Sequence, residues 1–503
     1  MGCTDTTHPS EQKLSLDAFG KLKADEYALN ALLIRENLEH ISHADHDRSY
    51  AASHVRDYYL QGGGMVWVDY QTVDDRADTL LTTLGNRLPA IGFSQKLFNV
   101  SQIREDLDRM RSLQFDKDND INLVAARLEY NLSKAYLRYA AGQRFGFVNP
   151  NNVLNHFELR KQDSTSRYPT YRQLYDVKIE RPANGYFQDI LAHATPDSLG
   201  SYLRQVEPST ELYLRLRQML AQADSSQREQ ILVNMERCRW RDSIKTTSTE
   251  KYVIVNVPAF HLWAVSPDSI VEMRVVCGNV KTKTPLLSSH ISYMQVNPEW
   301  MIPMSIIRDE VSPHGGDSSY FARNRYYIAD RETGARLSPA NVTPKMLRSG
   351  NYRVVQQGGE GNSLGRLVFR FPNNFSVFLH DTSSPRAFQR ENRGVSHGCV
   401  RVQRPFDLAV FMMEKDPDPQ LLDKLRISMG MKPETDWGRE QLDRLDPEED
   451  YPTLVRTISV SPRVPIIITY YTIFLTPGGS LQHYPDIYGY DKAIAEALKS
   501  YIK

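Results

Sequence analysis

The sequence is poor in cysteine, and none of its cysteines stands in a Cys-X-X-Cys pair. Only Cys3, Cys238, Cys277 and Cys399 occur among 503 residues. Their spacing argues against a zinc site, and a chain of this length does not need a disulfide framework to fold. We expect Cys238 and Cys277 to be small buried apolar side chains. Cys3 and Cys399 lie in short motifs that suggest chemistry, and neither a metal nor an organic cofactor is expected.

Neither sign of charge predominates, and no long apolar run is present. The 61 basic side chains balance the 61 acidic ones, so the basic surplus that a nucleic-acid-binding surface requires is missing. The longest apolar candidate, residues 465–475, falls short of the roughly 18 residues that span a bilayer. It predicts a buried strand instead. With 41% hydrophobic residues, the chain is expected to be globular.

The first six residues, Met1-Gly2-Cys3-Thr4-Asp5-Thr6, admit two functional interpretations. They fit the N-myristoylation pattern, with Thr6 in the required place. They also resemble the end of a bacterial lipoprotein signal, in which Cys3 is the lipidated residue. A chance match to such a short pattern is the third alternative. The envelope chemistry argued below favours the lipoprotein hypothesis, in which residues 1–20 are a leader remnant and the lipid attaches the chain to a membrane.

Periodic apolar residues predict helices through the first half of the chain. Between residues 121 and 139 they recur at steps of three and four, which places them on one helix face. Asp118 to Asp120 supply capping oxygens, and Gly142 is placed to end this helix. These patterns predict an all-α scaffold domain over residues 21–245. The other helical windows are 74–84, 102–113 and 211–237.

From about residue 246 the pattern changes to short strands separated by turn signals. The runs 367–371 and 376–380 flank Pro372-Asn373-Asn374, so they are expected to form a hairpin. Residues 307–365 interrupt the strands with glycine-containing segments, which is typical of a functional lid. The predicted fold class is therefore multidomain α + β, with an N-terminal all-α scaffold followed by a mostly-β domain over 246–503 that contains a lid insertion. The other strand-like runs are 251–257, 261–265, 270–276 and 464–475.

A histidine and a cysteine near residue 400 carry the chemistry. The histidine stands in Phe378-Leu379-His380-Asp381, and the cysteine follows in Ser396-His397-Gly398-Cys399-Val400-Arg401-Val402. A thiol at its free pKa is mostly protonated near neutral pH, and only the thiolate attacks well. The imidazole of His380 can take that proton if its ring projects from a strand end toward Cys399. Asp381 can orient the ring through its backbone carbonyl or its side chain.

The residues around Cys399 suit acyl transfer. Gly398 lets the backbone turn tightly before the nucleophile. The N–H groups of His397, Gly398 and Cys399 would then be free to stabilise an oxyanion. Arg401 lies two residues after Cys399, hence on the same face of a strand, where its guanidinium can hold a substrate carboxylate.

At these residues the sequence resembles the L,D-transpeptidase catalytic domain. The signature of that family is a His followed, after a gap, by Ser/Thr-His-Gly-Cys, an apolar residue and Asn or Arg; the gap here is fifteen residues. Other segments are similar to a larger periplasmic branch of the family, which carries a helical scaffold and a lid. No counterpart of that branch's small peptidoglycan-binding module is recognisable between residues 145 and 230. The similar segments are 234–240, Thr284-Pro285, Asn297-Pro298-Glu299-Trp300 and Asp486-Ile487-Tyr488-Gly489.

The resemblance implies a reaction on peptidoglycan stem peptides in the bacterial cell envelope, on the periplasmic side. Cys399 attacks the carbonyl of the third, diaminoacyl residue of a tetrapeptide stem and expels the terminal D-Ala. The side-chain amine of a neighbouring stem then captures the thioester as a 3→3 cross-link. Acylation by carbapenems is a further expectation. The expected catalytic residues are Cys399, His380, Asp381 (through its carbonyl), His397 and Gly398, and the expected substrate-binding residues are Arg401, Ser396, Trp300 and Asn297.

Four other functions are alternatives to this one. Capture of the thioester by water would make the chain an L,D-carboxypeptidase, and capture by another amine would attach a protein to the wall. A wall-binding scaffold lipoprotein without turnover would account for the helical half, although such a protein has no need of a His380–Cys399 pair. A papain-like protease fits poorly, because in that fold the cysteine precedes its histidine along the chain.

Overall fold

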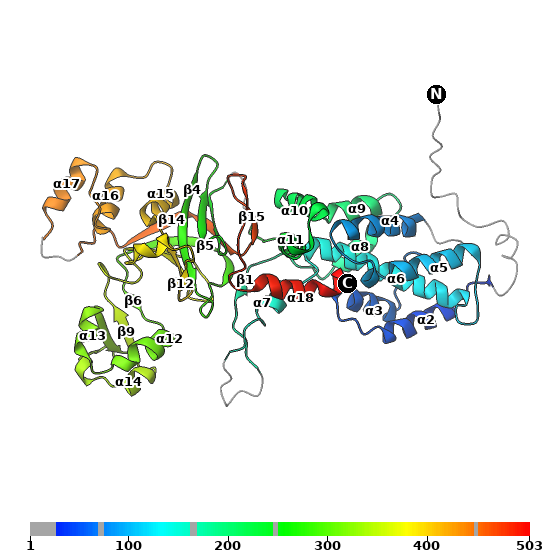
Figure 1. The fold of residues 1–503 in the computed structure, drawn as a ribbon, viewed down its shortest axis with the longest axis horizontal. Helices are drawn as coiled ribbons and strands as arrows, with labels where there is room; N and C mark the ends of the chain where they lie inside the picture. Colours follow the sequence, from blue (N-terminus) through cyan, green and yellow to red (C-terminus); the bar gives the residue numbers. More distant parts are fainter. Residues whose placement is uncertain (1–26, 69–74, 161–168, 245–249, 447–450) are drawn as a thin grey trace, which may run out of the picture. The chain divides into compact units, whose positions relative to one another are not determined.

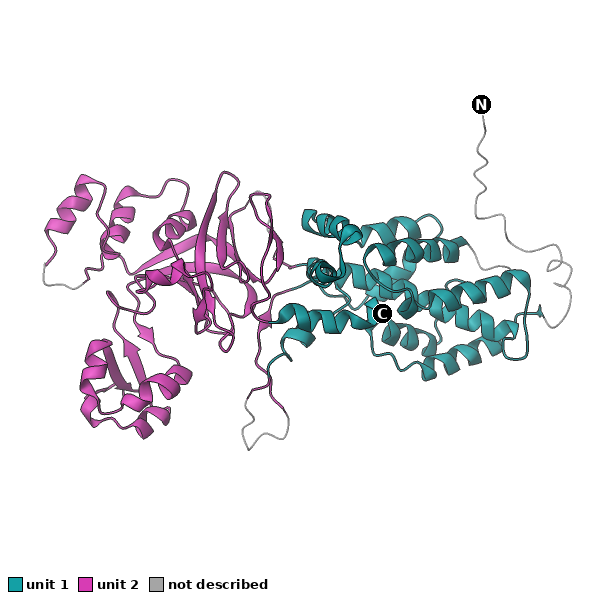
Figure 2. Ribbon diagram, viewed as in Figure 1, with its two compact units in different colours: residues 1–158, 179–241, 489–503 teal, residues 159–178, 242–488 magenta. Residues whose placement is uncertain are grey.

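The computed structural model describes residues 27–68, 75–160, 169–244, 250–446 and 451–503, and the chain forms two compact units (Figures 1 and 2). The helical unit comprises residues 1–158, 179–241 and 489–503, and the β unit comprises residues 159–178 and 242–488. The predicted leader and its Cys3 lie outside the described residues.

The two units are not separated at one point near residue 246. Residues 159–178 belong with the β unit because strand β1 (Tyr175–Asp176) pairs in parallel with β5 (Leu286–Val296). Residues 489–503 belong with the helical unit because their helix, α18 (Tyr490–Ile502), packs against α11 (Ser225–Arg239) and α7 (Pro150–Leu154). Neither the pairing of β1 with β5 nor the packing of α18 against α11 and α7 leaves a local sequence signal.

The helical character of the first half is confirmed, with corrections at two helix ends. Helix α6 (Ile121–Phe145) begins at Asp120, whose side chain accepts hydrogen bonds from first-turn N–H groups, as predicted. The predicted end at Gly142 is wrong, because the helix continues about one turn further to Gly146. Gly142 serves packing instead, since a Cβ there would lie 2.1 Å from the ring of Phe147.

The predicted helix over 211–237 is in fact two helices, α10 (Glu211–Gln222) and α11. The break comes at Asp224, whose carboxylate caps the first turn of α11. The other helices of this unit are α2 (Ala31–Ala44), α3 (Tyr50–Leu60), α4 (Asp75–Ala90), η3 (Lys96–Phe98), α5 (Val100–Ser112), α8 (Tyr186–Ala192) and α9 (Leu199–Gln205).

A fully buried carboxylate ties a loop to α6 in the helical unit. Glu129 is 0% exposed and accepts a hydrogen bond of 2.7 Å from the Tyr59 hydroxyl. It also accepts three bonds from the backbone N–H groups of residues 66, 67 and 68. Burial raises the pKa of Glu129, while these donors oppose that rise. The carboxylate therefore fixes the chain before α4.

The β unit is built on one large sheet in the order β1-β5-β10-β11-β13-β4-β3-β2-β14, with β12 beside β4. The path closes on itself because β14 also pairs with β5. The mostly-β character predicted from the sequence is confirmed. The other strands of this sheet are β2 (Tyr252–Asn256), β3 (His261–Val265), β4 (Ile270–Gly278), β10 (Leu367–Arg370), β11 (Leu379–His380), β12 (Gly394–Ser396), β13 (Val400–Val402) and β14 (Thr457–Thr469). A separate two-stranded sheet is formed by β15 (Ile473–Leu475) and β16 (Leu481–His483). Three helices follow β13: α15 (Pro405–Met412), α16 (Pro419–Ser428) and α17 (Asp436–Asp443).

The predicted hairpin exists, but its second strand is short. Strands β10 and β11 pair antiparallel, with Val368 opposite His380. The intervening loop is held by Asn373, whose side chain donates to the carbonyls of Phe371 and Val377. The predicted strand over 464–475 is also corrected. β14 starts earlier, at Thr457, and ends at Thr469, and β15 follows as a separate strand.

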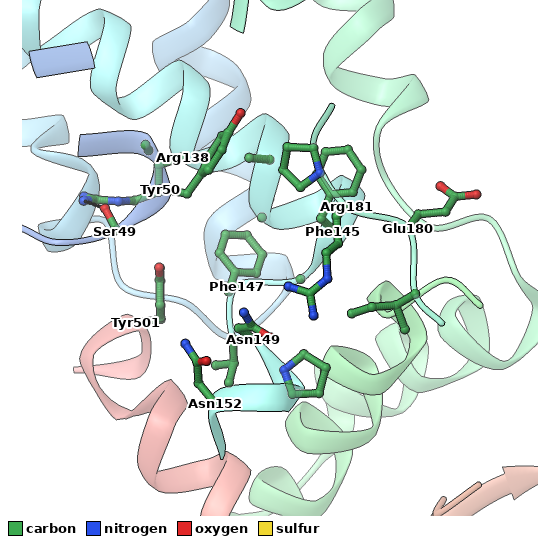
Figure 3. Close-up of a pocket in the computed structure, with 18 of the residues that line it drawn as sticks. Ser49, Tyr50, Arg138, Phe145, Phe147, Asn149, Asn152, Glu180, Arg181 and Tyr501 are labelled. Carbon is green, nitrogen blue, oxygen red and sulfur yellow. Dashed lines mark hydrogen bonds between the residues drawn. The ribbon is translucent and has the colours of Figure 1, made fainter. Parts of the chain in front are cut away.

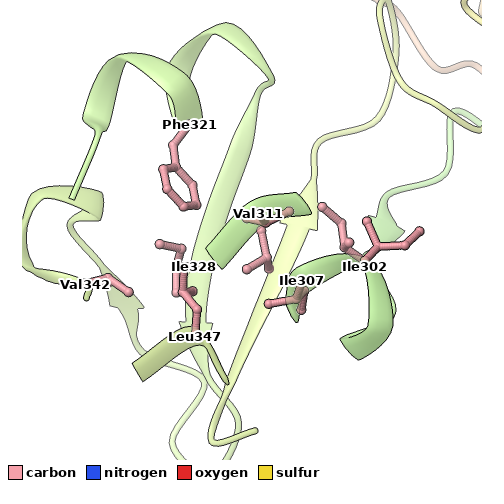
Figure 4. Close-up of a cluster of buried hydrophobic side chains, with 9 residues drawn as sticks. Ile302, Ile307, Val311, Phe321, Ile328, Val342 and Leu347 are labelled. Atoms are coloured by element: carbon pink, nitrogen blue, oxygen red, sulfur yellow. The ribbon is translucent and has the colours of Figure 1, made fainter. Parts of the chain in front are cut away.

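A subdomain is inserted between β5 and β10, with its own four-stranded sheet in the order β6-β9-β7-β8. Its core is a cluster of buried side chains that includes Ile307, Val311, Phe321, Ile328 and Leu347 (Figure 4). It therefore has a core separate from that of the large sheet. Its elements are β6 (Trp300–Met301), α12 (Met304–Ile306), η4 (Ile307–Val311), η5 (Ser312–His314), α13 (Ser318–Arg323), β7 (Tyr326–Asp330), β8 (Arg336–Leu337), η6 (Pro339–Asn341), α14 (Pro344–Arg348) and β9 (Tyr352–Gln356).

In the described ranges, none of the helices combines the length and the apolar content needed to cross a bilayer.

Candidate active site

The pairing of two short parallel strands brings the predicted base and nucleophile together. In the β11–β13 ladder, Leu379 lies opposite Val400 and His380 opposite Arg401. Side chains of paired residues share a face of the sheet, and the face alternates along each strand. His380 and Arg401 therefore share one face, and Cys399, just before β13, joins them. Leu379 and Val400 point to the other face, where both are 0% exposed.

His380 is held as a neutral imidazole in a closed environment. It is 4% exposed, and its Nδ1 lies 2.5 Å from the carbonyl oxygen of Asp381. If Nδ1–H donates to that oxygen, Nε2 is left as the basic nitrogen. Burial lowers the pKa of His380 to about 4, with the nearby guanidinium of Arg401 acting in the same direction. At neutral pH the ring is therefore unprotonated, the state that a general base needs before it accepts a proton.

The carboxylate of Asp381 faces away from this role. Its Oδ2 accepts a hydrogen bond of 2.8 Å from the Arg366 N–H. Gly365, with a φ of +65°, leaves room for it, because a Cβ at residue 365 would lie 2.5 Å from the Asp381 carboxylate. Of the two contacts that the sequence left open for Asp381, the structure contains the one through the backbone carbonyl.

Cys399 is a half-buried thiol with its proton retained in the resting protein. Its Sγ lies 3.9 Å from the carbonyl oxygen of Ser376. Burial raises the pKa of Cys399, whereas the N–H of Phe378 and the guanidinium groups of Arg370 and Arg401 lower it. The two cations therefore favour the thiolate at the moment it forms. By contrast, Cys238 and Cys277 are buried free thiols, as predicted.

The turn before Cys399 is held by hydrogen bonds to the side chain of Ser396, which lies within the turn. The Ser396 hydroxyl donates to the Cys399 carbonyl at 2.6 Å and accepts from the Gly398 N–H at 3.1 Å. Ser396 is 2% exposed, so its hydroxyl holds the turn. Gly398 has a φ of +118°, a conformation that favours glycine. Because the Gly398 N–H is already used, the N–H groups of His397 and Cys399 are the better candidates for an oxyanion hole.

A second set of hydrogen bonds anchors this turn to β4. The Thr284 hydroxyl donates to the Gly398 carbonyl at 2.9 Å and accepts from the Gly278 N–H at 2.8 Å. The Tyr488 hydroxyl donates to the Gly278 carbonyl at 2.6 Å and accepts from the Thr284 N–H at 3.1 Å. Thr284 and Tyr488 belong to the segments that resembled the larger branch of the family. In the structure, both side chains support the turn that precedes Cys399.

Arg370 is a site residue that the sequence reasoning missed. On β10 it lies two residues from Val368, which pairs with His380, so its side chain shares the face of the catalytic pair. Its guanidinium lies 4.4 Å from the centre of the Phe378 ring and within hydrogen-bond distance of Gln295. The available signal was a single arginine within the apolar run Leu367 to Phe371.

The inserted subdomain reaches the nucleophile motif at one polar contact. Nε2 of His397 lies 2.7 Å from Oε1 of Glu310, with both side chains about half exposed. Glu310 belongs to η4, which also supplies two residues of the subdomain core. The subdomain is thus in place to cover the face that carries Cys399.

Two predicted substrate contacts lie farther along the sheet. Asn297 has its side-chain nitrogen 2.9 Å from both the Ser428 carbonyl and the Thr453 hydroxyl, so it holds two loops. Trp300 is partly buried against the core of the inserted subdomain. The structure does not bring either side chain to Cys399 through any described contact, and their substrate roles stay a prediction.

The other cavities do not compete for the chemistry. One in the helical unit has a volume of about 380 Å³ and lies among Phe147, Asn149, Arg181 and Tyr501 (Figure 3). Neither cysteine nor histidine lines it. Within the described part of the chain, no group of three or more His, Cys, Asp or Glu side chains is arranged to hold a metal ion. The nucleophile, the base and the cations occur together only at Cys399 among the described residues.

This arrangement combines the groups that cysteine acyl transfer requires: a thiol, an imidazole and nearby cations. Residues 250–419 match the family described as the L,D-transpeptidase catalytic domain, and residues 53–220 match the scaffold domain family. The resemblance inferred from the sequence is thereby confirmed. Over these two ranges the chain is similar to an L,D-transpeptidase catalytic domain and to a scaffold domain.

One relative and one solved structure match part of this chain. A Haemophilus influenzae protein named "Putative L,D-transpeptidase" is 26% identical over 327 residues, which cover 63% of this chain and 60% of that protein. The chain thus spans about three fifths of the length of that relative. A solved structure of the Ldtfm–avibactam carbamoyl enzyme shares 10% identity over 63% of this chain and 74% of the other, with a TM-score of 0.18. That score is too low to compare the two folds.

Proposed function

We propose that this chain is a peptidoglycan L,D-transpeptidase that forms 3→3 cross-links through a thioester on Cys399. The observation that carries the proposal is the β11–β13 register, which sets His380 opposite Arg401, two residues after Cys399. The match to the L,D-transpeptidase catalytic domain supports peptidoglycan peptides as the substrate class.

In the first half-reaction, His380 acts as the general base. Its Nε2 takes the thiol proton while the Cys399 sulfur attacks the carbonyl carbon of the third residue of a tetrapeptide stem. The N–H groups of His397 and Cys399 stabilise the oxyanion. The C–N bond to D-Ala then breaks, the departing amine takes the proton from the imidazolium, and the thioester is left on Cys399.

In the second half-reaction, an amine replaces the thiol. The side-chain amine of a neighbouring stem attacks the thioester and gives its proton to His380. The C–S bond breaks, and the sulfur leaves as a thiolate that the imidazolium reprotonates. Arg370 and Arg401 favour that thiolate, because both guanidinium groups lower the pKa of Cys399. The amide product is the 3→3 cross-link.

The same proposal places the reaction on the periplasmic side of the bacterial cell envelope, where peptidoglycan is found. A lipid on Cys3 would hold the chain at a membrane. This attachment is a prediction from the sequence, since Cys3 lies outside the described residues.

The direct test is to incubate the purified protein with tetrapeptide stems and to analyse the products by mass. We expect D-Ala release together with 3→3 dimers. Release of D-Ala without dimers would make the chain an L,D-carboxypeptidase, because water would then be the acceptor. Full turnover by a Cys399→Ala variant would overturn both functions that depend on this thiol. No turnover by the wild-type protein would leave the wall-binding scaffold.

A carbapenem provides a second readout of the same thiol. We expect one covalent adduct on the wild-type protein by intact mass, and none on Cys399→Ser. Cys238→Ala is the matched control and should keep the adduct, because burial raises the pKa of Cys238 to about 12 and leaves that thiol unreactive.

A further inference from the structure

A cavity of about 550 Å³ opens on the loop that joins His380 to the nucleophile turn. Three arginines line it: Arg386 and Arg390 from the loop, and Arg401 from β13. The loop forms the short helix η7 (Pro385–Gln389), which fixes the backbone around Arg386. None of the residues that line the cavity is acidic.

The positive charges of this cavity are not neutralised by the protein. Among the described residues, Arg386 and Arg390 form no ion pair, and both are exposed. The Nε atom of Arg401 is buried and has no hydrogen-bond partner in the described part of the chain. A buried donor without a partner costs free energy, and like charges around one cavity repel. An anion in the cavity would relieve both effects.

The cavity lies close to the reacting atoms. Arg401 pairs with His380 across the β11–β13 ladder and is two residues from Cys399, roughly 7 Å along an extended strand. A substrate group held by Arg401 is therefore within a few bonds of a carbonyl at the Cys399 sulfur. The cavity volume also lies in the range of ordinary ligand sites, roughly 300–1,000 Å³.

We infer that this cavity, the arginine pocket, is a subsite for a free carboxylate of the stem peptide, recognised jointly by Arg386, Arg390 and Arg401. The inference rests on the proposed function for the identity of the peptide. Two carboxylates of the donor stem have the required chemistry: that of the terminal D-Ala, which leaves, and that of the diamino acid side chain, which stays on the thioester. Amidation of either one removes its charge and one acceptor oxygen.

The test measures binding to a Cys399→Ala protein, so that it does not depend on turnover. Calorimetry would compare the tetrapeptide stem with two analogues, one amidated at the D-Ala terminus and one at the diamino acid side chain. We expect one analogue to bind roughly tenfold more weakly, as loss of a charge-assisted bidentate contact implies. The preference should shrink as salt is added, because Arg386 and Arg390 are exposed.

The variant Arg386→Gln/Arg390→Gln should bind all three peptides alike, while Arg444→Gln is the control. Arg444 is an exposed arginine that pairs with Glu440 and does not line the cavity, so that variant should keep the preference. The analogue that binds more weakly identifies which carboxylate of the stem occupies the arginine pocket. Equal binding of the three peptides to the Cys399→Ala protein would overturn the inference, even if the wild-type protein cross-links stems. A preserved preference with no turnover by the wild type would overturn the proposed function and leave the subsite standing.

Discussion

Replacing His380 by asparagine removes the titration of the buried imidazole while keeping a donor near the carbonyl of Asp381. In the folded protein the pKa of His380 is lowered to about 4 from an ordinary value of 6.5, chiefly by burial. The unfolded chain therefore takes up a proton below pH 6.5 that the folded chain refuses until about pH 4. The folding free energy that depends on a neutral ring is complete above pH 6.5 and is lost as the pH falls toward 4.

The size of this loss follows from the two pKa values. A difference of 2.5 (6.5 − 4), at about 1.4 kcal/mol per pKa unit, amounts to about 3 kcal/mol. Between pH 7.5 and pH 4.0, the wild-type β unit should lose about 3 kcal/mol more unfolding free energy than His380→Asn. The other titrating groups are common to both proteins and cancel in the difference.

Hydrogen exchange of the β13 amides, measured in urea at both pH values, reports this unit without contributions from the helical unit. His290→Asn, which changes an exposed histidine on β5, is the control and should keep the wild-type pH dependence. An identical loss for the wild type and His380→Asn would refute the assignment of a buried neutral imidazole.

Three further predictions concern the supports of the site and of the scaffold. Gly398→Ala should lower stem-peptide turnover at least about tenfold, because a φ of +118° is strained by roughly 1–3 kcal/mol for alanine; unchanged turnover would mean that the turn does not aim the oxyanion N–H groups. Tyr488→Phe should destabilise the β unit by about 1–3 kcal/mol in thermal unfolding, since it leaves the Gly278 carbonyl and the Thr284 N–H without their partner; an unshifted melting temperature would contradict this. Glu129→Ala should cost the helical unit about 3 kcal/mol in urea unfolding, because four donors lose their acceptor. Glu129→Ala should leave the acylation of Cys399 by a carbapenem unchanged. Loss of acylation together with the stability of the helical unit would show that the two units depend on each other for folding.

The fold class and the residues of the candidate site could be predicted from the sequence, because both leave local signals. Helical periodicity and short strands with turn residues report on the nearest few positions. The spacing from His380 to Cys399 is a local signature too. The structure adds how the pair meets, through a parallel ladder of only two residue pairs, which is too short to be predicted from strand patterns.

What the sequence missed depends on side-chain contacts that follow no recognisable pattern. Gly142 was expected to stop a helix, whereas its missing side chain makes room for the ring of Phe147. Ser396 was expected to bind substrate, whereas its hydroxyl is used within the turn. Arg370 reaches the site only because β10 lies beside β11. None of these contacts leaves a periodicity or a motif that one sequence can show.

The discontinuous helical unit has a consequence for the order in which the protein is made. Helix α18 buries Ile494 and Leu498 completely, and its Asp491 forms an ion pair of 2.7 Å with Arg237 of α11. These partners of α11 are synthesised only after the whole β unit, residues 242–488. At roughly 5–20 residues per second, that interval lasts on the order of 12–50 s. The helical unit begins first in the sequence, yet it is the last that can be completed. A nascent chain halted before α18 would contain every residue of the β unit, Cys399 included, while its helical unit still lacked α18.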